Sequence, residues 1–326
     1  MAKKPEDIGR IPSRVSKEAK ERLDELASAS GRTQTSIIEE GIKMVAKLRK
    51  PTAKAIVIAS DKGGIGKTTA AGCLGHSLTK LGNKVLLIDF DHQGSLSELL
   101  QYDPEYNYQA RMTGSSLPHH ITLTDAVFEY TKDEPGSIED YILSTSVDNL
   151  DIIAGDDGLI NACKEIRSYK NDYGINILKR IIQAVKDLDK YDYIIVDTHP
   201  DLNEDTSSVF LAADCVLVPT TLDKSSIKAI IRMIRFVKKI QIASPELSLL
   251  GVFFNIVERG TQSTDLAYEG VTDTLPAEMI FTTQISRGQV ARQSELRAEL
   301  LTVRRPKDKI SLEYMNLAKE VVSRLG

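Results

Sequence analysis

The chain has 326 residues, of which 42 are Lys or Arg and 46 are Asp or Glu, and its formal net charge is −4. With 41% hydrophobic residues it can form one sizeable α/β core and a smaller module, which excludes a disordered or collagen-like chain. No run approaches the roughly 18 apolar residues that cross a bilayer, and the start lacks the apolar centre of a secretory signal. We therefore expect a cytoplasmic protein without a membrane anchor, in which Cys73, Cys163 and Cys215 are reduced core residues.

Residues 1–50 have a pattern of their own and carry an excess of positive charge. Alternating polar and apolar residues over 10–15 predict a short strand, and two amphipathic helices follow, separated by Gly31. Thr33 is a good N-cap for the second helix. Residues 51–54 begin with a proline that cannot continue a helix, so we expect a linker there.

So short a module cannot enclose a core alone, and we expect it to pair with a second copy. It resembles the ribbon-helix-helix repressors of the Arc and CopG type, in which strands from two subunits enter the DNA major groove. The resemblance implies that Arg10 and Arg14 contact DNA and that amides at Thr33 meet a phosphate. Pro12 departs from this pattern because it removes one strand donor. The alternative is a helical hairpin that docks on the main domain or dimerises without touching DNA.

Residues 55–326 have the texture of an α/β domain, since short apolar runs alternate with helical patterns. The runs span 55–60, 84–90, 191–197, 215–219 and 249–254. Such runs predict parallel strands that are buried on both faces of one sheet. The expected fold is a doubly wound, mostly parallel α/β sheet with a small N-terminal strand-helix-helix module.

A glycine-rich loop follows the first of these runs and leads directly into a helical pattern. The loop comprises Lys62, Gly63, Gly64, Ile65, Gly66, Lys67, Thr68 and Thr69. Glycines allow main-chain N–H groups to converge on phosphate oxygens, and the start of the helix adds partial positive charge. Lys67 can neutralise the outer phosphates, and the Thr68 hydroxyl can ligate Mg²⁺. The segment therefore predicts a nucleotide-binding phosphate loop.

The loop is not of the ordinary kind, because Asp61 replaces its first glycine and Lys62 adds a second lysine. This form resembles the deviant Walker A loop of the ParA/MinD class of ATPases, where the extra lysine reaches the other subunit's nucleotide. The resemblance implies ATP and Mg²⁺ as cofactors, a homodimer that encloses two ATP molecules, and slow intrinsic hydrolysis. The resemblance also implies that Lys62 and Lys67 act in catalysis. The alternative is a surface lysine beside a monomeric phosphate loop.

Acidic residues end two of the predicted strands. Asp89 and Asp91 lie in a segment that resembles the family's D-x-D-P-Q-G switch I sequence, with His92 where proline is usual. By this resemblance, Asp91 orients or deprotonates the attacking water and Asp89 supports the metal or the loop. Asp197 matches the Walker B position, which holds Mg²⁺ through water. His199 also stands where proline is usual, and we interpret it as a bystander.

Two further groups of residues extend the resemblance. Asn255 matches the position that usually reads the base. Basic residues over 285–309 favour salt-sensitive, non-specific contact with DNA phosphates. The expected DNA-binding residues here are Arg287, Arg292, Arg297, Arg304 and Arg305. The alternative is a solvated helix face whose charge is partly cancelled by nearby acids.

The last helical pattern is informative because a membrane-binding member of this class would end in a basic amphipathic helix. Here we expect a core-packing stripe instead. It consists of Leu312, Met315, Ala318, Val322 and Leu325. Membrane association is therefore not expected.

The resemblance as a whole implies a DNA partition ATPase. Its ATP-closed dimer would bind nucleoid DNA, and a ParB-like centromere-binding protein would stimulate hydrolysis. The N-terminal module would repress the protein's own operon. The alternatives are an ATP-sensing transcription regulator, or an ATPase that positions another cargo such as a conjugation complex or a protein cluster.

Overall fold

The structure is a computed structural model in which the chain forms two compact units, Met1–Pro51 and Thr52–Gly326. It describes residues 17–38, 40–41, 53–104, 121–168, 173–200, 204–223, 225–258, 260 and 262–326. The expected strand over 10–15, with Arg10 and Arg14, lies outside the described residues.

The first unit contains helix α1 (Lys17–Ser30), and the chain is helical again at 34–38 and 40–41. Gly31 ends α1 with a left-handed backbone, at φ 64°, as expected of a glycine that follows a helix. The Thr33 hydroxyl accepts a hydrogen bond from the Ser36 amide at 3.2 Å, which confirms the N-cap. Leu26 is 56% exposed, so α1 does not bury its apolar face within the described part of this unit.

The second unit is built on an eight-stranded sheet with the order β3-β4-β2-β5-β1-β6-β7-β8. The strands are β1 (Lys54–Ile58), β2 (Val85–Phe90), β3 (Leu143–Ser144), β4 (Leu150–Ile153), β5 (Tyr193–Thr198), β6 (Cys215–Thr220), β7 (Ser248–Val257) and β8 (Ile280–Ser286). All neighbouring strands run parallel except the pair β3 and β4. The five predicted strands are confirmed, and β3, β4 and β8 are additional.

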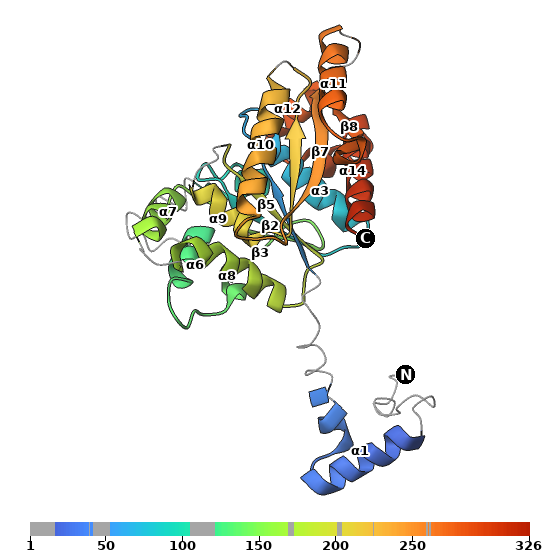
Figure 1. The fold of residues 1–326 in the computed structure, drawn as a ribbon. Helices are drawn as coiled ribbons and strands as arrows, with labels where there is room; N and C mark the ends of the chain where they lie inside the picture. The colour runs from blue at the N-terminus through green and yellow to red at the C-terminus, as the bar shows by residue number, and fades with distance from the viewer. Residues whose placement is uncertain are drawn as a thin grey trace. The chain divides into compact units, whose positions relative to one another are not determined.

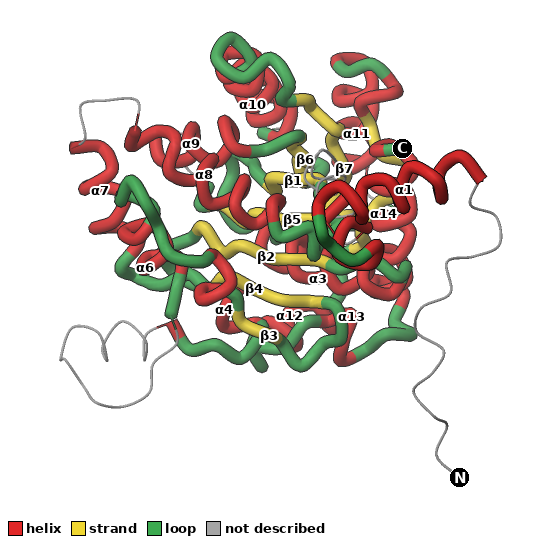
Figure 2. The backbone as a smooth tube through the Cα atoms, turned by 90° about the horizontal axis from the view of Figure 1, so that it is seen from below, coloured by secondary structure: helices red, strands yellow, loops and turns green. Residues whose placement is uncertain are grey.

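Helices cover both faces of the sheet, so the expected doubly wound α/β fold is confirmed (Figure 1). One face carries α3 (Lys67–Lys80), α4 (Ser95–Leu99), α12 (Gln289–Glu295), α13 (Leu301–Arg304) and α14 (Lys309–Leu325). The other carries α6 (Leu123–Glu129), α7 (Leu159–Ser168), α8 (Tyr173–Asp187), α9 (Glu204–Ala212), α10 (Ser226–Ile240) and α11 (Gln262–Thr274). Short 3₁₀ turns lie at Ile138–Tyr141 and Ala277–Met279. Figure 2 shows β3, β4, β2, β5 and β1 side by side between these two layers.

Among the described helices, none has the length and apolarity to cross a membrane.

The central strands are buried on both faces, which explains their continuous apolar sequences. In β1, Ile56 and Ile58 join the core beneath α3, whereas Ala55 and Val57 join the core on the opposite face. This alternation follows from the two-residue period of a strand. The three cysteines are buried and unpaired, as expected.

Helix α14 packs against α3 and β8, as the core-packing prediction expected, but only part of the predicted apolar stripe is confirmed. Ala318 is buried, and Val322 and Leu325 are partly buried against the core. The buried residues of the helix are Ile310, Ser311, Tyr314, Leu317, Ala318 and Val321, whereas Leu312 is 53% exposed. The predicted stripe is displaced to one side because it left out Tyr314, which is almost fully buried and lies at the centre of the observed buried face. The correct stripe follows the i, i+4, i+7, i+8 spacing of an amphipathic helix.

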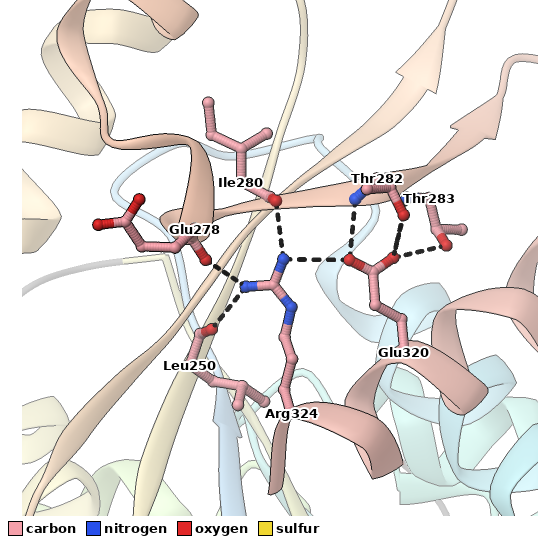
Figure 3. Close-up of polar contacts among 7 residues, drawn as sticks. All are labelled: Leu250, Glu278, Ile280, Thr282, Thr283, Glu320 and Arg324. Carbon is pink, nitrogen blue, oxygen red and sulfur yellow. Dashed lines mark hydrogen bonds and ion pairs between the residues drawn. The ribbon is translucent and has the colours of Figure 1, made fainter.

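Arg324 connects the end of α14 to the edge of the sheet (Figure 3). Its guanidinium donates hydrogen bonds to the main-chain carbonyls of Leu250, Glu278 and Ile280 at 3.4, 2.6 and 2.7 Å. It also lies 3.9 Å from the centre of the Phe281 ring. One planar side chain therefore satisfies carbonyls from β7, the second 3₁₀ turn and β8.

Glu320 completes this contact from one turn earlier in α14. Its carboxylate accepts hydrogen bonds from the amides and hydroxyls of Thr282 and Thr283, and it pairs with Arg324 at 3.1 Å. These bonds are charge-assisted and partly shielded from water, so they anchor strand β8 on the helix.

We expect Arg324→Met to lower the free energy of unfolding by about 2 kcal/mol, because three carbonyls lose a donor while the apolar stem is kept. Lys319→Ala, on the exposed face of the same helix, is the matched control and should change it by less than about 0.5 kcal/mol. Urea denaturation of the full chain measures both values. Equal stability of the two variants would show that the guanidinium contributes nothing.

Candidate active site

The phosphate loop lies between β1 and α3, at the carboxyl edge of the sheet. Gly63 and Gly64 are exposed, and Gly64 and Gly66 have left-handed φ angles of 69° and 75°. A Cβ atom on Gly66 would lie 2.9 Å from the Asn255 amide nitrogen, so a side chain is excluded there. Main-chain N–H groups of such a loop and the N-terminus of the helix that follows it together form a site suited to binding an anion.

The second lysine of the loop is directed into it. Lys67 is only 8% exposed, and its ammonium lies 3.4 Å from the main-chain oxygen of Lys62. A buried cation inside a ring of amides is suited to the outer phosphates of a nucleotide. Thr68, the next residue, is half-buried and close to Asp197.

The first lysine binds its own chain. The Lys62 ammonium donates to the Thr221 hydroxyl at 3.0 Å and pairs with Asp223, both in the loop between β6 and α10. Burial alone would raise the pKa of Asp223, but hydrogen bonds from Lys62, Ser225 and Thr221 outweigh it and hold the pKa well below its usual range. The two side chains are 29% and 42% exposed, so the pair contributes only about 0 to 1 kcal/mol. A stronger anion can therefore displace Asp223.

A second ion pair fastens the same loop to the same segment. Asp61, at the position of the missing glycine, pairs with Arg232 of α10. Both loop residues that depart from an ordinary phosphate loop are thus engaged by the β6 and α10 region.

Two carboxyl groups lie side by side behind the loop, because Asp89 of β2 is paired in register with Asp197 of β5. Both are fully buried on the face covered by α3. Burial and the neighbouring Asp89 charge raise the pKa of Asp197 well above its usual range. Neither Asp197 oxygen has a hydrogen bond of ordinary geometry, although the Thr68 hydroxyl is close enough to lower the pKa.

Asp89 differs because its hydrogen bonds are satisfied. Burial raises its pKa to about 6, while one oxygen accepts the Ser97 amide and hydroxyl at 2.8 and 2.7 Å. Asp89 therefore supports the segment after β2. Asp197 is the carboxylate whose buried negative charge lacks hydrogen bonds of ordinary geometry. A divalent cation held by oxygen ligands fits such an uncompensated pair, with Asp197 and the Thr68 hydroxyl as its protein donors.

Asp91 lies at the mouth of this site, in the loop after β2. It is half-buried, and its main-chain amide donates to Asp89 at 3.2 Å. His92 and His199 lie beside it, with their ring centroids 5.1 Å apart. The Asp91 side chain is 14% exposed, so solvent can reach its carboxylate.

A cavity of about 710 Å³ continues from the phosphate loop towards α12 and α14. Asn255 lines it and donates to the Ile65 carbonyl at 2.7 Å, while its own side-chain oxygen is buried without a partner. That oxygen is available to a hydrogen-bond donor such as the amino group of a base. Thr69 lines the same cavity and donates to Glu295 at 2.6 Å.

The expected DNA-binding arginines differ in their surroundings. Arg287 and Arg292 line the cavity just described, and Arg287 pairs with Glu258 at 3.2 Å. Arg297 lines a second cavity, together with His92, whereas Arg305 is exposed. Arg304 is half-buried and pairs with Glu299 at 3.4 Å. Thr33, in the first unit, caps a helix.

The family model of the AAA domain matches residues 53–249, which is more than half of the chain. A ParA family protein of Chlamydia pneumoniae is 30% identical over 274 residues, covering 82% of this chain and 97% of that protein. The chain belongs to the ParA family. The chromosome partitioning protein ParA of Caulobacter vibrioides is 26% identical, covering 83% and 94%. A solved complex of a Cyanothece McdA variant with ATP has a TM-score of 0.66 at 25% identity and covers 83% and 97%.

For a ParA family chain, the residues missed by sequence reasoning are those that hold the loop from the side. Thr221, Asp223 and Arg232 belong to the segment after β6, which the family resemblance treated only as a strand end and a helix. The position of Asp223 in the sequence could have identified it, because it follows β6, a central strand that lies next to β1 in the sheet. Polar residues at the carboxyl ends of adjacent parallel strands meet at one edge.

We expect Asp197→Asn to stabilise the nucleotide-free protein by about 1 to 3 kcal/mol, because it removes a buried carboxylate without hydrogen bonds. The same change should abolish the part of ATP-induced stabilisation that depends on Mg²⁺. Thermal denaturation with ATP, with and without Mg²⁺, measures both effects. Asp273→Asn, exposed on α11, is the control and should alter neither. A destabilised Asp197→Asn that still responds to Mg²⁺ would refute the assignment.

Proposed function

We propose that this chain is a Mg²⁺-dependent ATPase that forms an ATP-closed homodimer and moves DNA by partition. The observation that supports it most strongly is the buried, uncompensated Asp197 carboxylate beside Thr68 and the open phosphate loop. Mg²⁺ carried by ATP would neutralise this carboxylate, while loop amides and Lys67 would bind the phosphates. Asn255 would accept a hydrogen bond from the base.

Hydrolysis follows from the same arrangement. Asp91 would orient or deprotonate the attacking water, and Mg²⁺ would offset the charge that develops on the phosphates. Two triphosphates enclosed between subunits would repel one another strongly unless each subunit supplies a cation. Lys62 would do so after exchanging Asp223 for the partner's phosphates. We expect slow intrinsic turnover.

DNA partition is supported by the names of the relatives, which include a chromosome-partitioning ATPase Soj of Treponema pallidum, 28% identical over 274 residues. Arg292, Arg297 and Arg305 have no ion pair within the described chain, so their charge is available to DNA phosphates. A ParB-like centromere-binding protein would stimulate hydrolysis and release the dimer from nucleoid DNA. The N-terminal module would bind operator DNA and repress the operon.

We expect wild-type turnover to rise with non-specific duplex DNA and the rise to disappear as salt increases. Lys67→Ala should lose ATP binding. Lys62→Ala should still bind ATP but lose at least about tenfold of the DNA-stimulated turnover, because the closed dimer lacks its cation in trans. Phosphate release measured with and without DNA decides this.

Asp223→Asn is the matched control, since it keeps Lys62 and its Thr221 contact and removes only the charge of its ion-pair partner. It should change DNA-stimulated turnover by no more than about fivefold, because a half-exposed ion pair contributes about 0 to 1 kcal/mol. If Lys62→Ala matched the wild type, the role of this lysine in the partner's site would be wrong. An ATP-sensing regulator would bind one operator tightly without DNA-stimulated turnover.

We also expect the full chain to be a dimer without nucleotide, because the N-terminal module cannot enclose a core alone. A truncated chain beginning at Pro51 should be a monomer without ATP and a dimer with ATP and Mg²⁺. Light scattering after size-exclusion chromatography measures the mass of each species. A full-length monomer without nucleotide would contradict pairing through the module.

A further inference from the structure

The loops after β2 and β5 bring two histidines together. His92 follows β2 by two residues and His199 follows β5 by one, and their rings meet edge to face with centroids 5.1 Å apart. The two strands are direct neighbours in the sheet, which explains why loops 107 residues apart in sequence coincide in space. His199 is therefore not the isolated histidine that the sequence suggested.

Asp91 completes a cluster of three metal-ligating side chains. One ligand atom from each of Asp91, His92 and His199 lies within 4.8 Å of the other two. Metal–ligand distances of about 2.0 to 2.2 Å in a tetrahedral site place its ligand atoms roughly 3.3 Å apart. Small side-chain rotations therefore suffice to close the cluster on one ion. All three residues are half-buried, so an ion can enter from solvent.

The hydrogen bonds of Asp91 and His92 leave ligand atoms for a metal. Both hydrogen bonds that the Asp91 carboxylate accepts within the described chain use Oδ1, from the Gln93 amide at 3.0 Å and His92 Nδ1 at 3.2 Å. Its Oδ2 is therefore available. The Gln93 side-chain amide lies 3.2 Å from His92 Nε2. Asp91 Oδ1 and His92 Nδ1, at 3.2 Å, already have the spacing of two ligands of one ion. In the tautomer that carries its proton on Nε2, beside Gln93, the Nδ1 lone pair of His92 can ligate that ion.

The surroundings add oxygen donors and a route of entry. A cavity of about 810 Å³ opens beside His92 and is also lined by Glu98 and Asp157. Two imidazoles and a carboxylate with an open fourth position suit Zn²⁺ and related first-row dications, whereas Mg²⁺ prefers oxygen ligands alone.

We propose that Asp91, His92 and His199 form a site for Zn²⁺ or a similar transition-metal dication, separate in chemistry from the Mg²⁺ of the nucleotide. The bound ion links the loop after β2 to the loop after β5. It also draws the Asp91 carboxylate away from the attacking water. This second step rests on the proposed ATPase function, and it makes the ion an inhibitor of hydrolysis.

Metal binding is tested without reference to hydrolysis. Full-length protein freed of metal is titrated with Zn²⁺ in excess Mg²⁺ against a chromophoric chelator, and the visible d–d absorption of Co²⁺ reports ligand geometry. We expect one ion per chain with a tetrahedral Co²⁺ spectrum. His92→Asn and His199→Asn should each weaken Zn²⁺ binding at least about tenfold.

His76→Asn, at a histidine buried in α3 and outside the cluster, is the control and should leave binding intact. Circular dichroism verifies that each variant is folded. The proposal is overturned if the wild type binds no Zn²⁺, or if the two cluster variants bind it as tightly as the wild type.

The regulatory step is tested by turnover in excess Mg²⁺ and ATP. One equivalent of Zn²⁺ should lower wild-type turnover at least about tenfold, and a zinc-selective chelator should restore it. His199→Asn should need at least about tenfold more Zn²⁺ for the same fractional inhibition. Stoichiometric binding with unchanged turnover would overturn the inhibitory role. A chain without ATPase activity would overturn the proposed function, while the titration would still decide the metal site.

Discussion

The site depends on two carboxyl groups that are held side by side, out of contact with water, behind a glycine loop. Asp89 and Asp197 are placed there by the parallel pairing of β2 and β5, and the two differ in their hydrogen bonds. Ser97 satisfies Asp89, whereas Asp197 has no partner of ordinary geometry. The fold tolerates this arrangement because the surrounding sheet is rigid, and the unfavourable electrostatics are relieved when a cation arrives with the ligand.

The phosphate loop is held from the side as well as from behind. Asp61 and Lys62 both form ion pairs with the segment that follows β6, so the loop and the start of α10 form one charged assembly. These pairs are half-exposed and individually weak. Weak pairs suit the exchange of partners proposed for Lys62, because a strong internal bond would compete with any incoming phosphate.

Much of this architecture could be predicted from local sequence. Runs of β-branched and leucine residues identified the five central strands. Strands that are buried on both faces are continuously apolar, so polar residues do not interrupt the pattern. The glycine loop and the aspartates at the strand ends could be predicted equally directly from the sequence. The short strands β3 and β4 and the edge strand β8 were missed because Leu143–Ser144 is too short, and the 280–286 run contains polar residues. In α14 the predicted stripe included Ala318, Val322 and Leu325, which do contact the core, but it was off-centre because Tyr314 was not counted as apolar.

The pairings across the site could not be predicted, because they join segments far apart in the chain. Nothing near Lys62 in sequence indicates Asp223, and nothing near His92 indicates His199. Their proximity follows from the strand order β2-β5-β1-β6, which places the loops after these strands along one edge. Once that order is known, residues at the carboxyl ends of neighbouring strands can be compared directly.

One feature of the sheet bears on self-association. Its β3 edge consists of only two residues, paired antiparallel to β4. So short an edge offers too few free amides and carbonyls to template a strand from another molecule, and it therefore resists fibre-like growth of the sheet on this side.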